Sequence, residues 1–199
     1  MPLPFEPSDV REFSADYLQR TREGLWEDRA ALADLELGSR ERVLDVGCGT
    51  GELTRVLATE TPGEVVGVDA DTDLLAVAND RREPGDRTSF AAGDAHRLPF
   101  PDDHFDLVVC QALLVNLPDP ARAVREFTRV SDDLVAAVEP DNAVVSVEST
   151  VAAERDLARR ARAAFVEGVD TDVGLGGEGT RAAFREAGLD AVRTREHYH

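Results

Sequence analysis

Short apolar runs alternate with amphipathic segments through the middle of the chain. The apolar runs, which predict five strands, cover residues 43–46, 64–69, 88–91, 105–110 and 134–139. Helical spacing of apolar positions predicts helices over residues 52–58, 72–82 and 120–130. Continuously apolar strands separated by helices are typical of a parallel sheet that is covered on both faces. The pattern therefore predicts a three-layer, doubly wound α/β domain whose ligand lies at the carboxyl ends of the strands.

The two flanking regions add further predicted elements. Residues 8–37 carry apolar positions at helical spacing and predict one or two helices, which stop at Gly38. After the fifth strand we expect a long helix over residues 150–167, a short helix over residues 180–187 and a last strand at residues 191–195. A glycine-rich loop is predicted between these two helices, through Gly174, Gly176, Gly177 and Gly179.

The charge of the chain is unusual for a single domain of 199 residues. It has 40 acidic and 22 basic residues, which gives a formal net charge of −18, and all of the 22 basic residues are arginine. Self-repulsion of this size weakens a compact fold in dilute buffer and is screened in molar salt. We therefore expect a protein that works in concentrated salt, as in halophilic archaea; the alternative is an acidic mesophilic protein encoded by GC-rich DNA. The absence of a basic patch disfavours a nucleic-acid surface.

The sequence predicts a protein of the cytoplasm. Its first residues have neither a basic start nor the apolar run of a secretory signal, and no window approaches 18 consecutive apolar residues. Two cysteines do not make a disulfide scaffold, so a reducing compartment is expected.

Three glycines at alternate positions follow the first predicted strand. Gly47, Gly49 and Gly51 lie in the stretch VLDVGCGTGELTRVL, where the absence of Cβ atoms permits positive φ and close approach of a ligand. Dinucleotide enzymes use G-x-G-x-x-G at this place and bind a pyrophosphate on the following helix. Here the spacing is G-x-G-x-G, and Glu52 stands where that pattern has its third glycine. A carboxylate in the first turn of the helix would repel a pyrophosphate, so another ligand is favoured.

The motif D-V-G-C-G-T-G, from Asp45 to Gly51, resembles the first motif of the class I S-adenosylmethionine-dependent methyltransferases. The resemblance continues in EVVGVDAD, which ends the second strand, and in GDAHRLPFPDDHFDLVVCQ. The run GDAHRLPFPDDHFDLVVCQ, residues 93–111, is similar to the corresponding run of the ubiquinone and menaquinone biosynthesis enzymes of the "methyltransferase type 11" group. The resemblance implies that Asp69 binds the ribose hydroxyls, that Asp94 reaches the adenine amino group and that Ala95 supplies a backbone contact. It implies this cofactor site: Asp45, Gly47, Cys48, Gly49, Gly51, Asp69, Ala70, Asp94, Ala95 and Gln111.

The same resemblance implies a small-molecule methyltransferase that needs neither a metal ion nor a covalent intermediate and converts S-adenosylmethionine to S-adenosylhomocysteine. We expect one domain over residues 1–199: a helical cap at 1–38, a cofactor-binding core at 40–140, and a lid helix with the sixth strand at 141–199. Tyr17, Arg22 and Asn116 are candidates for substrate binding, with residues 150–179 as the lid, and no catalytic residue stands out. The family normally has a seventh strand, whereas this chain stops at His199, inside or just after the sixth; either the seventh strand is missing or the fold closes differently. A monomer or homodimer is expected.

Three other functions stay open. An RNA or protein methyltransferase would be favoured by a basic surface or a partner subunit. A non-catalytic cofactor-binding subunit is favoured by the lack of a convincing general base. A nicotinamide-dependent dehydrogenase is opposed by the glycine spacing and Glu52. Cys48 lies in the glycine loop after the first strand and Cys110 ends the fourth, and these strands are neighbours in the usual order 3-2-1-4-5. Both cysteines are interpreted as small buried residues rather than a redox switch. His96 is interpreted as a loop residue, and Asp132 and Asp133 as a solvated turn.

Overall fold

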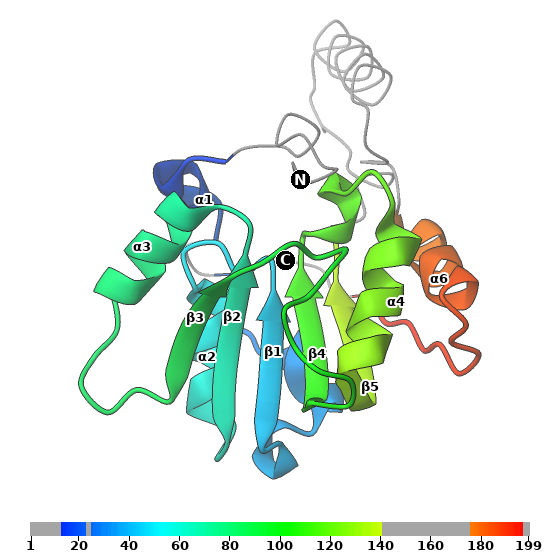
Figure 1. Cartoon of the computed structure of the whole chain (residues 1–199), viewed down its shortest axis with the longest axis horizontal. Coiled ribbons are helices and arrows are strands. Elements are labelled where there is room, and N and C mark those ends of the chain that lie inside the picture. Colours follow the sequence, from blue (N-terminus) through cyan, green and yellow to red (C-terminus); the bar gives the residue numbers. More distant parts are fainter. Residues whose placement is uncertain (1–12, 23–24, 141–175, 197–199) are drawn as a thin grey trace, which may run out of the picture.

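A computed structural model of the chain describes residues 13–22, 25–140 and 176–196. Its centre is a five-stranded sheet in the order β3-β2-β1-β4-β5, in which every neighbouring pair is parallel. The strands are β1 (Arg42–Val46), β2 (Glu64–Asp69), β3 (Thr88–Ala92), β4 (Phe105–Gln111) and β5 (Ser131–Val138). All five arrows point the same way in Figure 1, so the carboxyl ends meet along one edge of the sheet. The predicted parallel sheet and its order are confirmed.

Helices cover both faces of this sheet, with α2 behind it and α4 in front in the view of Figure 1. The α-helices are α1 (Ala15–Arg22), α2 (Glu52–Glu60), α3 (Thr72–Asp80), α4 (Pro120–Val130) and α6 (Gly176–Glu186). The short 3-10 helices are η2 (Ala30–Leu35), η3 (Leu37–Ser39) and η4 (Leu114–Asn116). Local chemistry sets the starts of α3 and α4. Asp71 and Asp119 cap these helices by accepting backbone N–H bonds from their first turns, and Pro120 occupies the first turn of α4.

The apolar core is divided between the two faces of the sheet. Leu44 of β1 packs in one cluster with α4 and with Phe184 of α6, whereas its neighbour Val43 packs in the other with α2 and η2. Successive side chains of a strand point to opposite faces, so a strand buried on both sides must be apolar throughout. Among the described residues, no helix is long and apolar enough to cross a membrane.

Two predictions near β5 and α6 are wrong in their boundaries. β5 begins at Ser131, directly after α4, so Asp132 and Asp133 lie in an exposed stretch of strand and not in a turn. Gly176 to Gly179, expected in a loop, form the first turn of α6, where Thr180 Oγ1 donates to the Gly176 carbonyl at 2.9 Å. Burial of Phe184 anchors this helix despite the low helix propensity of glycine. The predicted helix at 150–167 lies outside the described residues.

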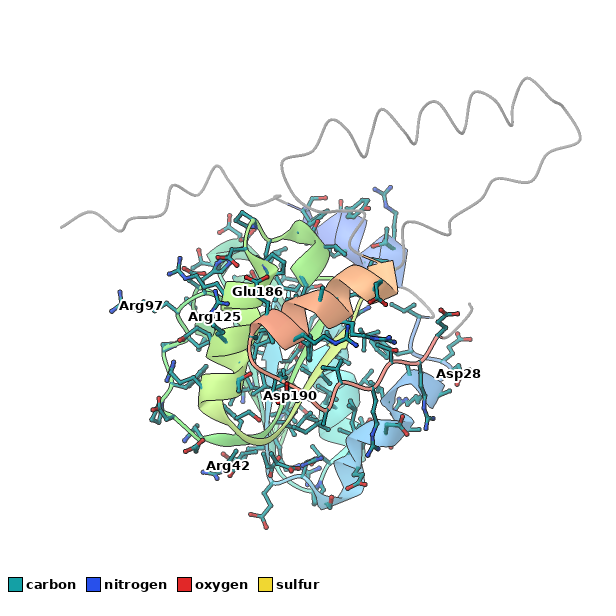
Figure 2. The ribbon with its side chains drawn as sticks, turned by 90° about the vertical axis from the view of Figure 1, so that its right-hand side faces the viewer. Asp28, Arg42, Arg97, Arg125, Glu186 and Asp190 are labelled. Carbon is teal, nitrogen blue, oxygen red and sulfur yellow. The ribbon has the colours of Figure 1, made fainter. Side chains whose placement is uncertain are left out.

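The predicted last strand is absent, because residues 191–195 form no strand in the structure. Figure 2 shows α6 beside α4, with the chain beyond Asp190 running across to the region of η2. This segment is held by side chains instead of a backbone ladder: Thr194 bonds to Arg181, and Arg195 Nε lies 2.8 Å from Asp34 Oδ2. Alternating apolar residues predict a strand only where another strand is available for pairing.

Candidate cofactor site at the carboxyl ends of the strands

The glycine turn joins β1 to α2 in a conformation that only glycine adopts easily. Gly47, Gly49 and Gly51 have φ values of +71°, +54° and +78°. The turn is fixed to β2, because the Val68 carbonyl accepts the N–H groups of Gly47 at 2.8 Å and Cys48 at 3.1 Å. A Cβ atom at Gly47 would lie 2.8 Å from Leu113 Cδ1, so this position also requires close approach. The turn thus has the geometry that the sequence predicts.

Asp69, at the end of β2, is bonded directly to this turn. Its Oδ2 accepts the Gly49 N–H at 2.7 Å, and its Oδ1 accepts the Asp71 N–H at 2.9 Å. Burial raises the pKa of the Asp69 carboxyl above its ordinary value, and the two N–H bonds oppose that rise. Each carboxylate oxygen keeps a lone pair, so the group can accept two further hydrogen bonds. Ala70, next to it, is exposed.

Asp45 differs from Asp69 in its surroundings. Its residue is 1% exposed, and its Oδ2 accepts the Thr54 hydroxyl at 2.6 Å. This bond ties β1 to α2 beneath the glycine turn. The structure therefore places Asp45 inside the domain, where it supports the turn, whereas Asp69 is only partly buried.

Asp94 follows β3 and forms a compact bend with the next two residues, Ala95 and His96. Its Oδ1 accepts the His96 N–H at 2.8 Å and lies 3.1 Å from His96 Nδ1. The side chain of Asp94 is 43% exposed, whereas that of His96 is 2% exposed. Ala95 packs against the core cluster on the α4 side. The sequence interpretation of His96 as an ordinary loop residue missed its burial, which depends on contacts with α4.

The end of β4 contributes a second group of polar side chains. Gln111, the last residue of β4, is buried, and its Oε1 has no hydrogen-bond partner in the described chain. Asn116 is also buried and donates from Nδ2 to the Ala112 carbonyl at 2.8 Å. Ala112 has a φ of +48°, so the backbone turns sharply between these two residues. An orphaned buried oxygen is costly unless a ligand satisfies it, which makes Gln111 the stronger of the two candidates.

Glu139 was not predicted as a site residue, although it directly follows β5. Its carboxylate accepts the N–H groups of Leu113 and Leu114 at 3.0 Å each and that of Val115 at 3.3 Å. The Cys110 thiol also points to it, at 3.7 Å. Burial raises the pKa of Glu139 above its ordinary value. An acidic residue at the carboxyl end of the fifth strand was the available signal, and its partners could not be inferred from spacing.

Both cysteines are free and buried, as predicted. Burial is the largest cause that raises the pKa of Cys110 well above its ordinary value, and the nearby charges of Glu139 and Asp45 raise this pKa further. A thiol that holds its proton so strongly is a poor nucleophile, so Cys110 is a packing residue.

The structure weakens one electrostatic argument of the sequence analysis. Glu52 lies in the first turn of α2 as expected, but its carboxylate accepts from Arg81 Nη1 at 2.8 Å and from the Thr50 hydroxyl at 2.7 Å. Arg55 Nη2 also lies near this carboxylate, 3.6 Å from Glu52 Oε1. The two cations neutralise the carboxylate, so its repulsion of a pyrophosphate is smaller than the bare sequence indicates. The glycine spacing remains the argument against a dinucleotide.

The predicted substrate-binding residues are only partly described. Tyr17 lies on α1, is 46% exposed and stacks on Phe13 with ring centroids 5.5 Å apart. Arg22 ends the same helix, and its side chain lies outside the described part of the structure, as do residues 150–175 of the predicted lid. Within the described ranges, no group of three or more potential metal ligands gathers.

The central part of the chain is similar in sequence to known methyltransferases. Residues 44–133 match the family described as "Methyltransferase domain". The demethylmenaquinone methyltransferase of Lactiplantibacillus plantarum is 41% identical over 107 residues, which are 51% of this chain and 45% of that protein. The 2-phytyl-1,4-naphtoquinone methyltransferase of Synechococcus elongatus is 42% identical over 95 residues, which are 45% and 41% of the two chains. The chain spans about half or less of the length of these curated relatives.

Solved structures extend the likeness beyond that central part. A putative methyltransferase from Bacillus halodurans superposes with a TM-score of 0.61 at 24% identity, over 81% of this chain and 68% of that one. The [4+2]-cyclase SpnF superposes with a TM-score of 0.58 at 26% identity, over 92% and 61%. Residues 44–133 are therefore similar to a methyltransferase domain, and the described chain shares its fold with the solved structure of a putative methyltransferase.

Proposed function

We propose that the protein is an S-adenosylmethionine-dependent methyltransferase that acts on a small molecule. The observation that carries the proposal is the bond between the Asp69 carboxylate and the Gly49 N–H, at the carboxyl end of the sheet. It holds an acceptor for ribose hydroxyls against a positive-φ glycine turn. The match of residues 44–133 to a methyltransferase domain supports the same cofactor.

The residues present fit this cofactor. Asp69 would accept the ribose hydroxyls, Asp94 the adenine amino group, and the turn from Gly47 to Gly51 would lie against the methionine part. Gln111 Oε1, which lacks a partner in the described chain, would accept a donor of the cofactor or substrate. A sulfonium cation suits the partly buried carboxylates of this edge better than a pyrophosphate does.

When bound, S-adenosylmethionine supplies a methyl group that is already activated for displacement. The task of the protein is then to hold the acceptor in line with that methyl group and to exclude water. Positioning of this kind can contribute about 7–11 kcal/mol to lowering a barrier. No general base is assigned among the described residues, so the proton that the methyl group replaces on a quinol ring would pass to solvent.

The matched relatives suggest an acceptor to test first. Their names give demethylmenaquinone and 2-phytyl-1,4-naphtoquinone as the compounds that those proteins methylate. Both compounds contain a naphthoquinone ring, so we propose an aromatic quinone-type acceptor, beginning with demethylmenaquinone in its reduced form. We further propose that the expected lid at residues 150–179 and the cap before β1 complete the pocket, and that the protein works in the cytoplasm.

A function other than methyl transfer has one observation in its favour. SpnF shares the fold over most of this chain and is described as a [4+2]-cyclase, so the fold alone does not fix the reaction. Binding of the cofactor and transfer of its methyl group must therefore be measured separately. A non-catalytic subunit would bind the cofactor and transfer nothing.

Calorimetric titration tests the proposal. The full chain, in about 2–3 M KCl to screen its net charge of −18, is titrated with S-adenosylmethionine, S-adenosylhomocysteine and NADH. We expect binding of the first two and not of the third, and then methyl transfer to demethylmenaquinol from an isotopically labelled cofactor. Binding of NADH alone would refute the assignment.

The high acidity leads us to propose that the protein belongs to a salt-rich cell. The midpoint of thermal unfolding should rise between dilute and molar KCl, because salt screens repulsion among 40 acidic side chains. A midpoint that stays constant would contradict this part of the proposal.

A further inference from the structure

We propose that His96 is a positioning residue for the cofactor: it fixes the Asp94 carboxylate so that the second oxygen of this group is held ready for the adenine amino group. The inference rests on the proposed function and deepens it. It assigns a role in cofactor binding to a buried histidine that contacts no reacting atom.

The contacts of Asp94 are divided unequally between its two oxygens. Oδ1 receives the backbone N–H of His96 at 2.8 Å and faces the Nδ1 of the same residue at 3.1 Å. Oδ2 makes no hydrogen bond within the described part of the chain. The carboxylate is thus held at one oxygen, while the side chain remains 43% exposed. A carboxylate restrained in this way loses less rotational freedom when a ligand binds.

The His96 ring is itself fixed from the other side. Its Nε2 lies 3.1 Å from the backbone carbonyl oxygen of Asp119, the residue that caps α4. Both ring nitrogens therefore face acceptors, the Asp94 carboxylate on one side and the Asp119 carbonyl on the other. The ring connects the bend after β3 to the start of α4, and its side chain is only 2% exposed.

This arrangement excludes a more common role for histidine. A general base must reach the proton that it removes, with a ring nitrogen free to accept it. Neither ring nitrogen of His96 is free in this sense, and the ring is buried. Arg97, the next residue, is exposed, and Figure 2 shows its side chain extending away from the domain. It offers a matched control from the same bend.

The test compares two ligands. One is S-adenosylhomocysteine; the other is its analogue with a purine ring that lacks the 6-amino group. Dissociation constants are measured by calorimetry for the wild type and for the His96→Leu, His96→Asn and Arg97→Leu variants of the full chain in molar KCl. The amide nitrogen of asparagine occupies nearly the place of Nδ1, so His96→Asn keeps the donor to Asp94.

We expect His96→Leu to weaken binding of S-adenosylhomocysteine about 3- to 10-fold, the scale expected for one restrained side chain, and to leave binding of the analogue unchanged. His96→Asn should retain most of the affinity, and Arg97→Leu should match the wild type. An equal loss for both ligands, or no loss in His96→Leu, would overturn the inference and leave the proposed function standing. If His96→Leu does not fold, His96→Asn becomes the test. A loss of affinity in His96→Asn by the same factor for both ligands would then overturn the inference. Failure of the wild type to bind S-adenosylhomocysteine would instead refute the proposed function.

Discussion

The two ends of the sheet carry buried charge in different ways. At the amino end, Arg40 is buried and donates to the carbonyl oxygens of Leu35 at 2.9 Å and Asp106 at 3.0 Å, and it forms an ion pair with Asp133. At the carboxyl end, Asp69 and Glu139 accept hydrogen bonds from backbone N–H groups, and no cation pairs with either in the described chain.

We interpret this difference as one between a structural end and the proposed binding end of the sheet. The charge at the amino end is balanced within the protein, so its removal should affect folding alone. The carboxylates at the other end are held in place but not neutralised, and burial raises the pKa of both. A cationic ligand with hydroxyl donors would supply the positive charge and the further hydrogen bonds that these carboxylates lack.

The largest effect on folding is expected at the amino end. Arg40→Met should lower the free energy of unfolding by about 2–4 kcal/mol, because two carbonyl groups lose a charged donor and Asp133 loses its partner. Arg42→Met is the matched control: its guanidinium is half exposed and lies 3.9 Å from Asp132, so about 0.5 kcal/mol or less is expected. Urea titrations at fixed KCl measure both. Equal losses for the two variants would break the comparison.

A smaller loss is expected from Glu139→Ala at the carboxyl end. The substitution leaves three N–H groups of residues 113–115 without their acceptor, at a cost of about 1–3 kcal/mol after water enters the turn. Because Leu113 packs over Gly47, the variant should also weaken cofactor binding. Urea titration and calorimetry on the same sample measure the two effects. Loss of stability without any loss of affinity would contradict a link between this turn and the site.

Glu139→Gln isolates the contribution of this carboxyl to the pH dependence of stability. The folded protein holds a proton on Glu139 at pH values at which the unfolded chain, with a pKa of about 4.3, has released it. In that window the wild type should gain stability relative to the glutamine variant as the pH falls, since glutamine does not titrate. The two free energies of unfolding are compared from neutral pH downward. A gain in the opposite direction would mean that the bonds to residues 113–115 outweigh desolvation.

Local signals predicted those parts of the fold whose causes are local. α4 was predicted at its observed bounds because its apolar residues recur at helical spacing, and in the structure Asp119 and Pro120 form its start. β2 was likewise predicted at its observed bounds from a continuous apolar run. The expected strand at residues 191–195 failed because pairing depends on a neighbouring strand, which no local pattern reveals.

The same distinction applies to the site. The positive-φ glycine turn and the position of Asp69 beside it could be predicted because a motif at fixed spacing marks both, and their role in cofactor binding stays a prediction. The burial of His96 and the bonds of Glu139 could not, because they depend on partners 23 to 26 residues away in the sequence, at Asp119 and Leu113. Asp45 belongs to the motif, yet its described bond to Thr54 supports the turn from below. Spacing identifies a loop, whereas burial and partners decide what each side chain in it does.

On the proposed function, the carboxylate of Asp69 serves a ligand more than it serves the fold. The most direct measurement is the dissociation constant of S-adenosylhomocysteine for the wild type, Asp69→Ala and the control Asp73→Ala, whose side chain is exposed on α3. We predict that Asp69→Ala weakens binding by about 2–4 kcal/mol, or about 30- to 900-fold, because two hydrogen bonds to a charged acceptor are lost. Asp73→Ala should leave the constant unchanged. An affinity of Asp69→Ala equal to that of the wild type would contradict the account.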